Sequence, residues 1–366
     1  MIPLLPRSRE AYEAIRRGHK RLTTLGLWNA DAGYVADLPY SEGTLEWSLS
    51  KADGVQSGRV TVPDYSWMPI VEPGKRTWVH AVTEIEGERW DHGTFPILRA
   101  VLNRPRGTVE LTLGSWAYRR AQPDGEVATT IGATTQTVKQ VVEEYMGHVM
   151  PLGRFTVTRD DSKGAKVVTP YELSLGSDVW TALTTHANAV GCVIIVTGRD
   201  TGEIRKFDPL APYHDDVDGL VIGETVAIVA DEAVNLVIVQ AETSNPEGGT
   251  TVFRAERKLT TGPYAYGLGF GEFALVETVR LPAPTQALVE AEAQRIFDRR
   301  AGIVRSQQID IVPVPWVQPG DVIAWRSTAN GPLYGMVDSI SYPLTARGQM
   351  RLTMRDTVIR GRGGDS

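Results

Sequence analysis

The sequence has almost no cysteine. Cys192 is the only one among 366 residues, so no disulfide can form within the chain and no thiolate metal cluster can be built. Cys192 lies in the apolar run 191–196, which predicts a small buried side chain and not a reactive thiol. The chain must therefore hold its fold by packing and hydrogen bonding alone.

The sequence also lacks a large excess of charge of one sign and lacks long apolar runs. The 38 basic and 44 acidic side chains leave a formal charge of −6, which argues against general affinity for nucleic acid or anionic membranes. No apolar stretch approaches the roughly 20 residues of a membrane span. The amino terminus lacks the apolar run of about 7–15 residues of a secretory signal. We expect a protein made in the cytoplasm that does not insert into a membrane by itself.

Catalytic motifs are the third absence. The sequence has no nucleophile elbow, no paired-histidine zinc helix and no phosphate-binding loop that ends in Gly-Lys-Ser/Thr. The glycine run 267–271 lacks the third glycine of a dinucleotide fingerprint. The acidic stretch 214–219 lacks the distal glutamate of a calcium loop and is expected to be a solvated turn. We therefore predict no catalytic residue, no metal ligand, no cofactor and no enzymatic activity.

Two functional alternatives stay open for the first third of the chain, a glycosidase-like site and a sugar-binding surface. His80 and His92 lie among carboxylates that could supply glycosidase-like acid and base groups, although a hairpin tip explains these acids equally well: Glu84, Glu86, Glu88 and Asp91. The tryptophans of this region are expected to fill a core, and the alternative is a sugar-binding aromatic platform: Trp28, Trp47, Trp67, Trp78, Trp90 and Trp116.

The hydrophobic pattern predicts an α+β, mainly β chain. Residues 22–122 have β character, and the clearest strand is 109–113. Helices are expected at 134–149, capped by Thr134 or Thr135, and at 178–190. A hairpin should follow, with strands 192–196 and 204–207.

The second half of the chain continues with strands at 226–228 and 236–239, the latter central because it is apolar on both faces. No regular element suits residues 245–273, which are predicted to be an arm that orders against a partner through Tyr264, Tyr266 and Phe270. A helix is expected at 285–300, with Leu288, Ala291, Ile296 and Phe297 facing inward.

Residues 312–355 carry the best-formed motif, three short strands joined by turns. Pro319 presets a turn and Gly320 supplies its left-handed position. Met350, Leu352 and Met354 alternate with polar residues, which predicts one buried and one wet face. The organisation expected is a β-barrel-like domain with a short amino-terminal helix (1–125), an α/β insertion (126–220) and a second β-barrel-like domain (221–366).

The closing segment, with the helix before it, resembles the carboxy-terminal part of minor tail proteins of actinobacterial siphophages. These look like central tail hub proteins, related to the hub subunits of contractile-phage baseplates. The resemblance covers most of the chain, but only the last fifth has a specific motif. Its signature is carried by Pro319, Gly320, Asp321, Gly331, Asp338, Pro343, Leu344, Met350 and Arg355.

This resemblance implies two small β-barrel-like domains that flank an α/β insertion, and it brings no catalytic residues. It implies a homotrimeric structural protein of the virion at the distal end of the tail. The expected partners are the tail tube or distal tail protein, the tape measure protein and the receptor-binding or tip proteins, with DNA in passage only. The alternatives are a distal tail subunit with a carbohydrate-binding role and a tail-tip cell-wall hydrolase.

Overall fold

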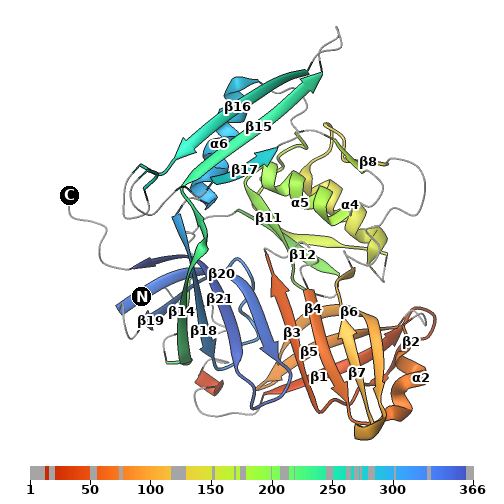
Figure 1. Cartoon of the computed structure of the whole chain (residues 1–366). Helices are drawn as coiled ribbons and strands as arrows, with labels where there is room; N and C mark the ends of the chain where they lie inside the picture. The colour runs from red at the N-terminus through yellow and green to blue at the C-terminus, as the bar shows by residue number, and fades with distance from the viewer. Residues whose placement is uncertain are drawn as a thin grey trace. The chain divides into compact units, whose positions relative to one another are not determined.

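The computed structural model describes most of the chain (Figure 1). The described residues are 13–15, 21–49, 56–73, 77–116, 129–150, 153–168, 170–173, 179–198, 200–206, 214–217, 219–244, 250–260, 265–267, 272, 274–278, 285–300, 302–327 and 331–359. Two compact units divide the chain, one made of residues 1–225 and 308–366 and the other of residues 226–307. Each unit is described by itself below.

The first unit is organised by one large sheet. Its strands follow the order β14-β18-β21-β20-β3-β4-β7-β6-β5-β1-β2, and off this path β19 pairs with β20 and β13 pairs with β19. The bounds are β1 Leu22–Asn29, β2 Gly33–Asp37, β3 Glu42–Ser48, β4 Gln56–Val62, β5 Thr77–Ile85, β6 Glu88–Asn103, β7 Thr108–Leu113, β13 His214–Asp216, β14 Val221–Val234, β18 Gly302–Ile311, β19 Val322–Ser327, β20 Gly331–Pro343 and β21 Met350–Ile359. Only the first part of β14, up to residue 225, and the last part of β18, from residue 308, belong to this unit.

Strand β20 joins the two ends of the chain. It pairs with β19 and β21 on the carboxy-terminal side and with β3 of the amino-terminal region, where Ile340 lies opposite Trp47. A single hydrophobic core follows this sheet from Leu25 to Met354. The α+β, mainly β fold class is thus confirmed, and the described strands form one open path and not two separate closed barrels.

Residue alternation accounts for the strands of this sheet. In β7, Val109, Leu111 and Leu113 are buried while Glu110 and Thr112 are exposed, as the period of two requires. In β21, Met350, Leu352 and Met354 are buried, so the predicted buried face is confirmed. Between β4 and β5, η1 (Tyr65–Trp67) and α2 (Met68–Val71) interrupt the strands. A second short 3-10 turn, η2 (Arg104–Arg106), connects β6 and β7.

The insertion is a small α/β layer. Helices α4 (Val138–Val149) and α5 (Val179–Ala189) pack against the sheet β11-β12-β9 (Figure 1). The strands are β9 Thr156–Asp160, β11 Cys192–Val196 and β12 Thr201–Lys206, and β8 Thr129–Ile131 pairs with β10 Tyr171–Leu173. Both predicted helices and the hairpin are confirmed, and Cys192 is buried as expected.

The cap predicted for α4 is wrong. The helix begins at Val138, and its N-cap is Thr137, not Thr134 or Thr135. Thr137 Oγ1 accepts a hydrogen bond from Gln140 N at 3.2 Å, and Gln140 Oε1 accepts one from Thr137 N at 2.9 Å. This reciprocal capping box satisfies two amide groups that the helix itself leaves without partners. The spacing Thr-x-x-Gln therefore decides among several threonines.

The second unit contains β15 (Leu236–Ser244) between β16 (Thr250–Lys258) and β17 (Ala274–Thr278), with helix α6 (Gln286–Arg300) packed on the sheet. The central position predicted for 236–239 is confirmed. The absence of regular structure predicted for 245–273 is wrong at 250–258, where β16 pairs with all of β15. Its side chains are mostly polar, so the hydrophobic signal of a strand is weak.

The inward face predicted for α6 is partly wrong. Val289, Ala293 and Ile296 are buried, whereas Leu288 is exposed and Ala291 lies on the same exposed side. The buried set follows helical spacing onto Val237 and Val239 of β15. Within the described part of the chain, no helix has both the length and the apolar character needed to cross a membrane.

Candidate functional site

The tight turn 318–321 is the centre of the candidate site. Gly320 has φ of 87°, and Asp321 N donates to Gln318 O at 3.1 Å, so the predicted turn with its left-handed glycine is confirmed. Gly320 N also donates to Val337 O of β20 at 2.7 Å. A Cβ at Gly320 would lie 3.1 Å from Ile195 Cδ1. Glycine thus allows the turn to approach β11 of the insertion closely.

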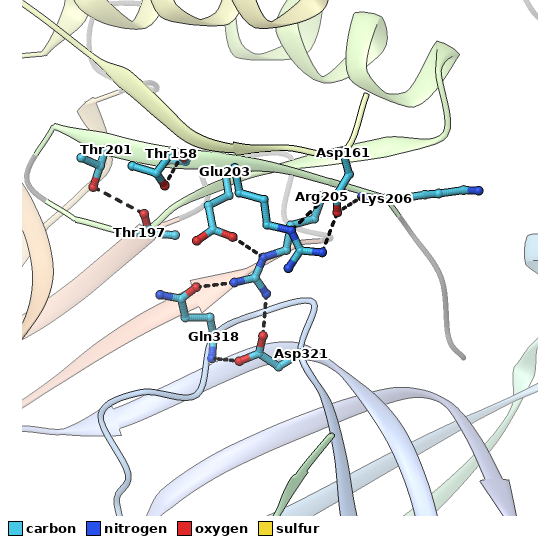
Figure 2. Close-up of polar contacts among 11 residues, drawn as sticks. Thr158, Asp161, Thr197, Thr201, Glu203, Arg205, Lys206, Gln318 and Asp321 are labelled. Atoms are coloured by element: carbon cyan, nitrogen blue, oxygen red, sulfur yellow. Dashed lines mark hydrogen bonds and ion pairs between the residues drawn. The ribbon is translucent and has the colours of Figure 1, made fainter. Parts of the chain in front are cut away.

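Arg205 of β12 ties the insertion to this turn (Figure 2). Its guanidinium lies 2.5 Å from Asp321 Oδ1 and donates to Gln318 Oε1 at 2.7 Å and to Glu203 Oε2 at 2.6 Å. Asp321 Oδ2 in turn accepts from Gln318 N at 2.8 Å. The Arg205 and Asp321 side chains are only 13% and 18% exposed. The planar guanidinium thus makes several charge-assisted hydrogen bonds that join segments distant in sequence. We call this contact the junction.

The electrostatics of the junction follow from burial. Burial raises the pKa of Asp321, against the opposing effect of the Arg205 guanidinium. Burial lowers the pKa of Arg205, but the carboxylates of Asp321 and Glu203 outweigh it and raise that pKa above its ordinary value. The guanidinium is therefore charged at any pH the protein meets, and it needs its acceptors because an uncompensated buried charge is costly.

A small pocket opens beside the junction. It has a volume of about 30 Å³ and is lined by residues of β3, β6, β11, β20 and the turn, including Trp47, Asp91, His92, Gln318 and Tyr342. This volume accommodates about two water molecules. The pocket is too small for a sugar or a nucleotide.

His92 forms the wall of this pocket and belongs to a buried polar cluster. His92 Nε2 lies 2.7 Å from Thr83 Oγ1, which is 2.9 Å from Thr23 Oγ1 and 3.2 Å from the Tyr342 hydroxyl. The His92 and Tyr342 rings are 4.7 Å apart. Burial lowers the pKa of His92 to about 4. His92 is thus neutral at physiological pH and serves as an internal hydrogen-bonding group that links β5, β6 and β20.

The acid and base groups considered for glycosidase chemistry are separated by the fold. His80 Nε2 lies 3.1 Å from Asp91 Oδ1, so one histidine and one carboxylate do meet. Glu86 has φ of 52° and precedes Gly87 in the turn between β5 and β6, so Glu84, Glu86 and Glu88 belong to a hairpin tip. His92 points into the core instead.

The tryptophans are also separated. Trp47, Trp78 and Trp116 are buried, and Trp28, Trp67 and Trp90 are half-buried. Trp78 and Trp116 pack edge to face at 5.8 Å, and Trp47 packs against Phe95. The six rings therefore do not share one exposed face, and core packing accounts for the three that are buried.

The other signature residues lie along β20 and β21. Gly331 begins β20 opposite Ser327, the Asp338 carbonyl accepts from Leu49 N at 2.9 Å, and Pro343 lies opposite Thr44. Leu344 and Met350 are buried, and Arg355 lies opposite Met336 in the ladder. Among the described signature residues, Gly320 and Asp321 contact the insertion, and Pro319 lines the same pocket as Val196 and Thr197. The remaining signature residues fall where β20 and β21 join the sheet, and their predicted role as a hub signature stays a prediction.

The predicted arm is seen only in part. Tyr264 and Phe270 lie outside the described residues. Tyr266 N donates to Leu259 O at 2.8 Å, and Lys258 Nζ lies 4.6 Å from the centre of the Tyr266 ring. Tyr266 thus contacts the end of β16 in its own unit, and its role toward a partner stays a prediction.

Sequence reasoning missed Arg205, Gln318 and Tyr342 as parts of the site. Arg205 is 116 residues from Asp321 and Tyr342 is 259 residues from Thr83, so no local spacing connects them. The only available signal was an arginine near the end of a hairpin strand whose partner strand, Cys192–Val196, is apolar.

Comparisons with known proteins show the fold. The sequence matches no family profile and no curated protein. The structure is similar to a tail protein from Neisseria meningitidis MC58, with a TM-score of 0.61 at 14% identity over 92% of this chain and 97% of that one. It is also similar to the 43 kDa tail protein of prophage MuSo2 from Shewanella oneidensis, with a TM-score of 0.57 at 12% identity over 91% and 98%.

A third similar structure is the prophage tail protein gp18 from Listeria monocytogenes EGD-e, with a TM-score of 0.51 at 8% identity over 90% of this chain and 94% of that one. In all three the likeness spans nearly the full length of both chains. The chain therefore has the fold of these phage tail proteins, and the identities are too low to carry more than the fold.

Proposed function

We propose that this chain is a non-enzymatic structural protein of a phage tail, acting as a hub at the distal end. Three copies form a ring that joins the tail tube or distal tail protein to the host-contacting tip and lets DNA pass. The observation that carries the proposal is the similarity to the Neisseria tail protein across 92% of this chain and 97% of that one. Because fold alone does not fix function, the proposal needs a direct test of assembly.

The internal construction of the first unit fits such a role. The junction at Arg205 bonds the insertion to the turn, and the cluster at His92 links β5, β6 and β20, so both fix segments that are far apart in the sequence. A ring component that bears the load between tube and tip needs this stiffness. The mild net charge of −6 also suits a passage through which DNA must move without adhering.

The partners follow from the position proposed. The tail tube or distal tail protein and the tape measure protein would meet the ring on one side, and receptor-binding or tip proteins on the other. A siphophage of an actinobacterial host is the setting that the carboxy-terminal motif favours.

Mass measurement of the assembled particle tests the proposal. We expect the purified chain to form a trimer, alone or on addition of the tube or distal tail protein, and negative-stain images to show a ring with a central hole. Six copies per ring would favour a distal tail subunit instead. A monomer that binds neither protein would contradict the proposal, and release of soluble fragments from purified peptidoglycan would favour a cell-wall hydrolase.

A further inference from the structure

Three aromatic rings form a continuous row across strands β2, β1 and β5. The Tyr34 and Trp28 rings are 5.6 Å apart and meet edge to face, and the Trp28 and His80 rings are 6.5 Å apart in the same arrangement. Tyr34 lies directly opposite Trp28 in the ladder. The three rings therefore share one face of the sheet, and we call them the ring row.

A carboxylate stands at each end of the ring row. The Tyr34 hydroxyl donates to Asp37 Oδ1 at 2.8 Å, and His80 Nε2 lies 3.1 Å from Asp91 Oδ1. Asp37 is exposed, and the Asp91 side chain is 43% exposed. The hydrogen bond to Asp37 holds the Tyr34 ring, and Asp91 Oδ1 also accepts from Gly93 N at 2.7 Å. Both carboxylates keep exposed surface on which further donors can bind.

Gly26 makes the row possible. A Cβ at Gly26 would lie 3.2 Å from Trp28 Nε1 and 3.5 Å from Tyr34 Cε2, so the two rings close over a strand position that has no side chain. Trp28 is also held in place because it packs against the hydrophobic core of the insertion. Rings that are held in place in advance lose little conformational freedom on binding.

The row is accessible from solvent at its Tyr34 end. Strand β2 ends the described path of the large sheet, and Tyr34 on it is 51% exposed, whereas Trp28 is half-buried and the His80 side chain is 17% exposed. A partly exposed row of rings with a carboxylate at each end combines apolar surface with directional acceptors, as small-molecule sites do.

We propose that the ring row is a binding site for a neutral or amino-sugar oligosaccharide. The faces of the rings carry negative quadrupole charge and attract the positively polarised C–H face of a sugar ring. Asp37 and Asp91 accept hydrogen bonds from its hydroxyl, amide or ammonium groups. Because a carboxylate stands at each end of the ring row, anionic polymers are disfavoured.

The site reaches beyond the proposed structural role. In a tail protein it would give the particle a weak first contact with a surface glycan, reinforced when several copies are held in one assembly. The site does not depend on the ring, since all its residues come from one chain. Binding and assembly can therefore fail independently.

Titration of the purified full-length chain with soluble oligomers of N-acetylglucosamine and of glucose tests the proposal, with an oligogalacturonate as the anionic probe. Saturation-transfer NMR or calorimetry should detect binding of at least one neutral or amino-sugar oligomer and weaker or no binding of the galacturonate. Tyr34→Ala should weaken binding about tenfold, the value of one ring contact. Tyr34→Phe keeps the ring and should cost less.

Tyr65→Ala is the matched control, because Tyr65 is 63% exposed on η1 and takes no part in the row. Trp28→Ala should abolish binding, and its circular dichroism spectrum separates lost binding from lost folding. Binding of no neutral or amino-sugar oligomer, or equal losses for Tyr34→Ala and Tyr65→Ala, would overturn the proposal. Particle mass measured on the same variants reports separately on the hub assembly.

Discussion

Two arginine–aspartate pairs in the first unit connect segments that are distant in sequence, and they differ in burial. Arg205 and Asp321 are 13% and 18% exposed; both are bonded to Gln318, and Arg205 is also bonded to Glu203. Arg351 of β21 and Asp310 of β18 lie 2.9 Å apart, with exposures of 56% and 24%. The geometry of the two pairs is similar, so solvent decides what each contributes. The first pair bonds the insertion to the turn of the sheet. The second pair lies on two strands, β18 and β21, that backbone hydrogen bonds already hold together.

The largest expected effect comes from breaking the buried pair. Asp321→Ala leaves the Arg205 guanidinium buried with fewer acceptors, and it should lower the free energy of unfolding by about 3–5 kcal/mol. Chemical denaturation monitored by tryptophan fluorescence measures the change. Asp310→Ala is the matched control at the exposed pair. A similar loss for both variants would mean that burial is not what separates them.

A pH titration extends the comparison to a buried group without an ionic partner. His92 has a folded-state pKa of about 4 because of burial, against an ordinary value of 6.5. Between these two values the unfolded chain binds more protons, so acidification favours unfolding. The free energy of unfolding should be fully retained above about pH 6.5 and fall by up to about 3 kcal/mol as pH approaches 4.

The variant His92→Gln should flatten this acid-side slope, whatever its effect on stability at neutral pH. His148→Gln, at an exposed position on α4, serves as the control and should keep the slope of the unaltered chain. An unchanged slope in His92→Gln would show that other groups cause the acid sensitivity.

The exposed pair should matter little. Arg351→Ala is expected to change the free energy of unfolding by about 0–1 kcal/mol, because water replaces the carboxylate as partner and the ladder is unaffected. The same denaturation measurement applies. A loss near that of Asp321→Ala would place Arg351 in an interface or network that burial in the isolated chain does not reveal.

The smallest expected effect is that of salt on the coupling energies of the two pairs. Added salt screens charges that face water over a distance of about 10 Å at 0.1 M and acts weakly on buried pairs. The coupling energy of Arg351 with Asp310, from a double-mutant cycle, should shrink by a few tenths of a kcal/mol at high salt. The coupling of Arg205 with Asp321 should be unchanged, and equal salt dependence would contradict the difference in burial.

Elements with strong local signals were predictable from the sequence. Strand β7, the turn at Gly320 and the buried face of β21 follow from alternation and from the conformational needs of glycine, which act over a few residues. The threonine-rich start of α4 misled because three threonines compete, and only the hydrogen bond to Gln140 selects Thr137. Strand β16 was missed because its extended conformation depends on hydrogen bonds to β15 and not on a hydrophobic pattern of its own.

The site was less predictable than the fold. Asp321 was singled out as part of a turn, but its partner Arg205 comes from a hairpin that only the folded chain brings near. Asp91 and His92 are neighbours in sequence, yet Asp91 lies against half-buried His80 while His92 contacts Thr83 in the core. Spacing alone cannot distinguish these directions, because a shift in register between Ala81 and Val82 disturbs the regular alternation of the strand pair.

Because β20 lies late in the chain, the large sheet can be completed only near the end of translation. Strand β3 gains one of its two neighbours only when residues 339–343 have been made, so a chain still on the ribosome presents an unfinished sheet for almost the whole of translation. Such an edge invites pairing with other nascent chains. A prematurely terminated product would carry the same open edge permanently, so we expect truncation before β20 to yield insoluble material.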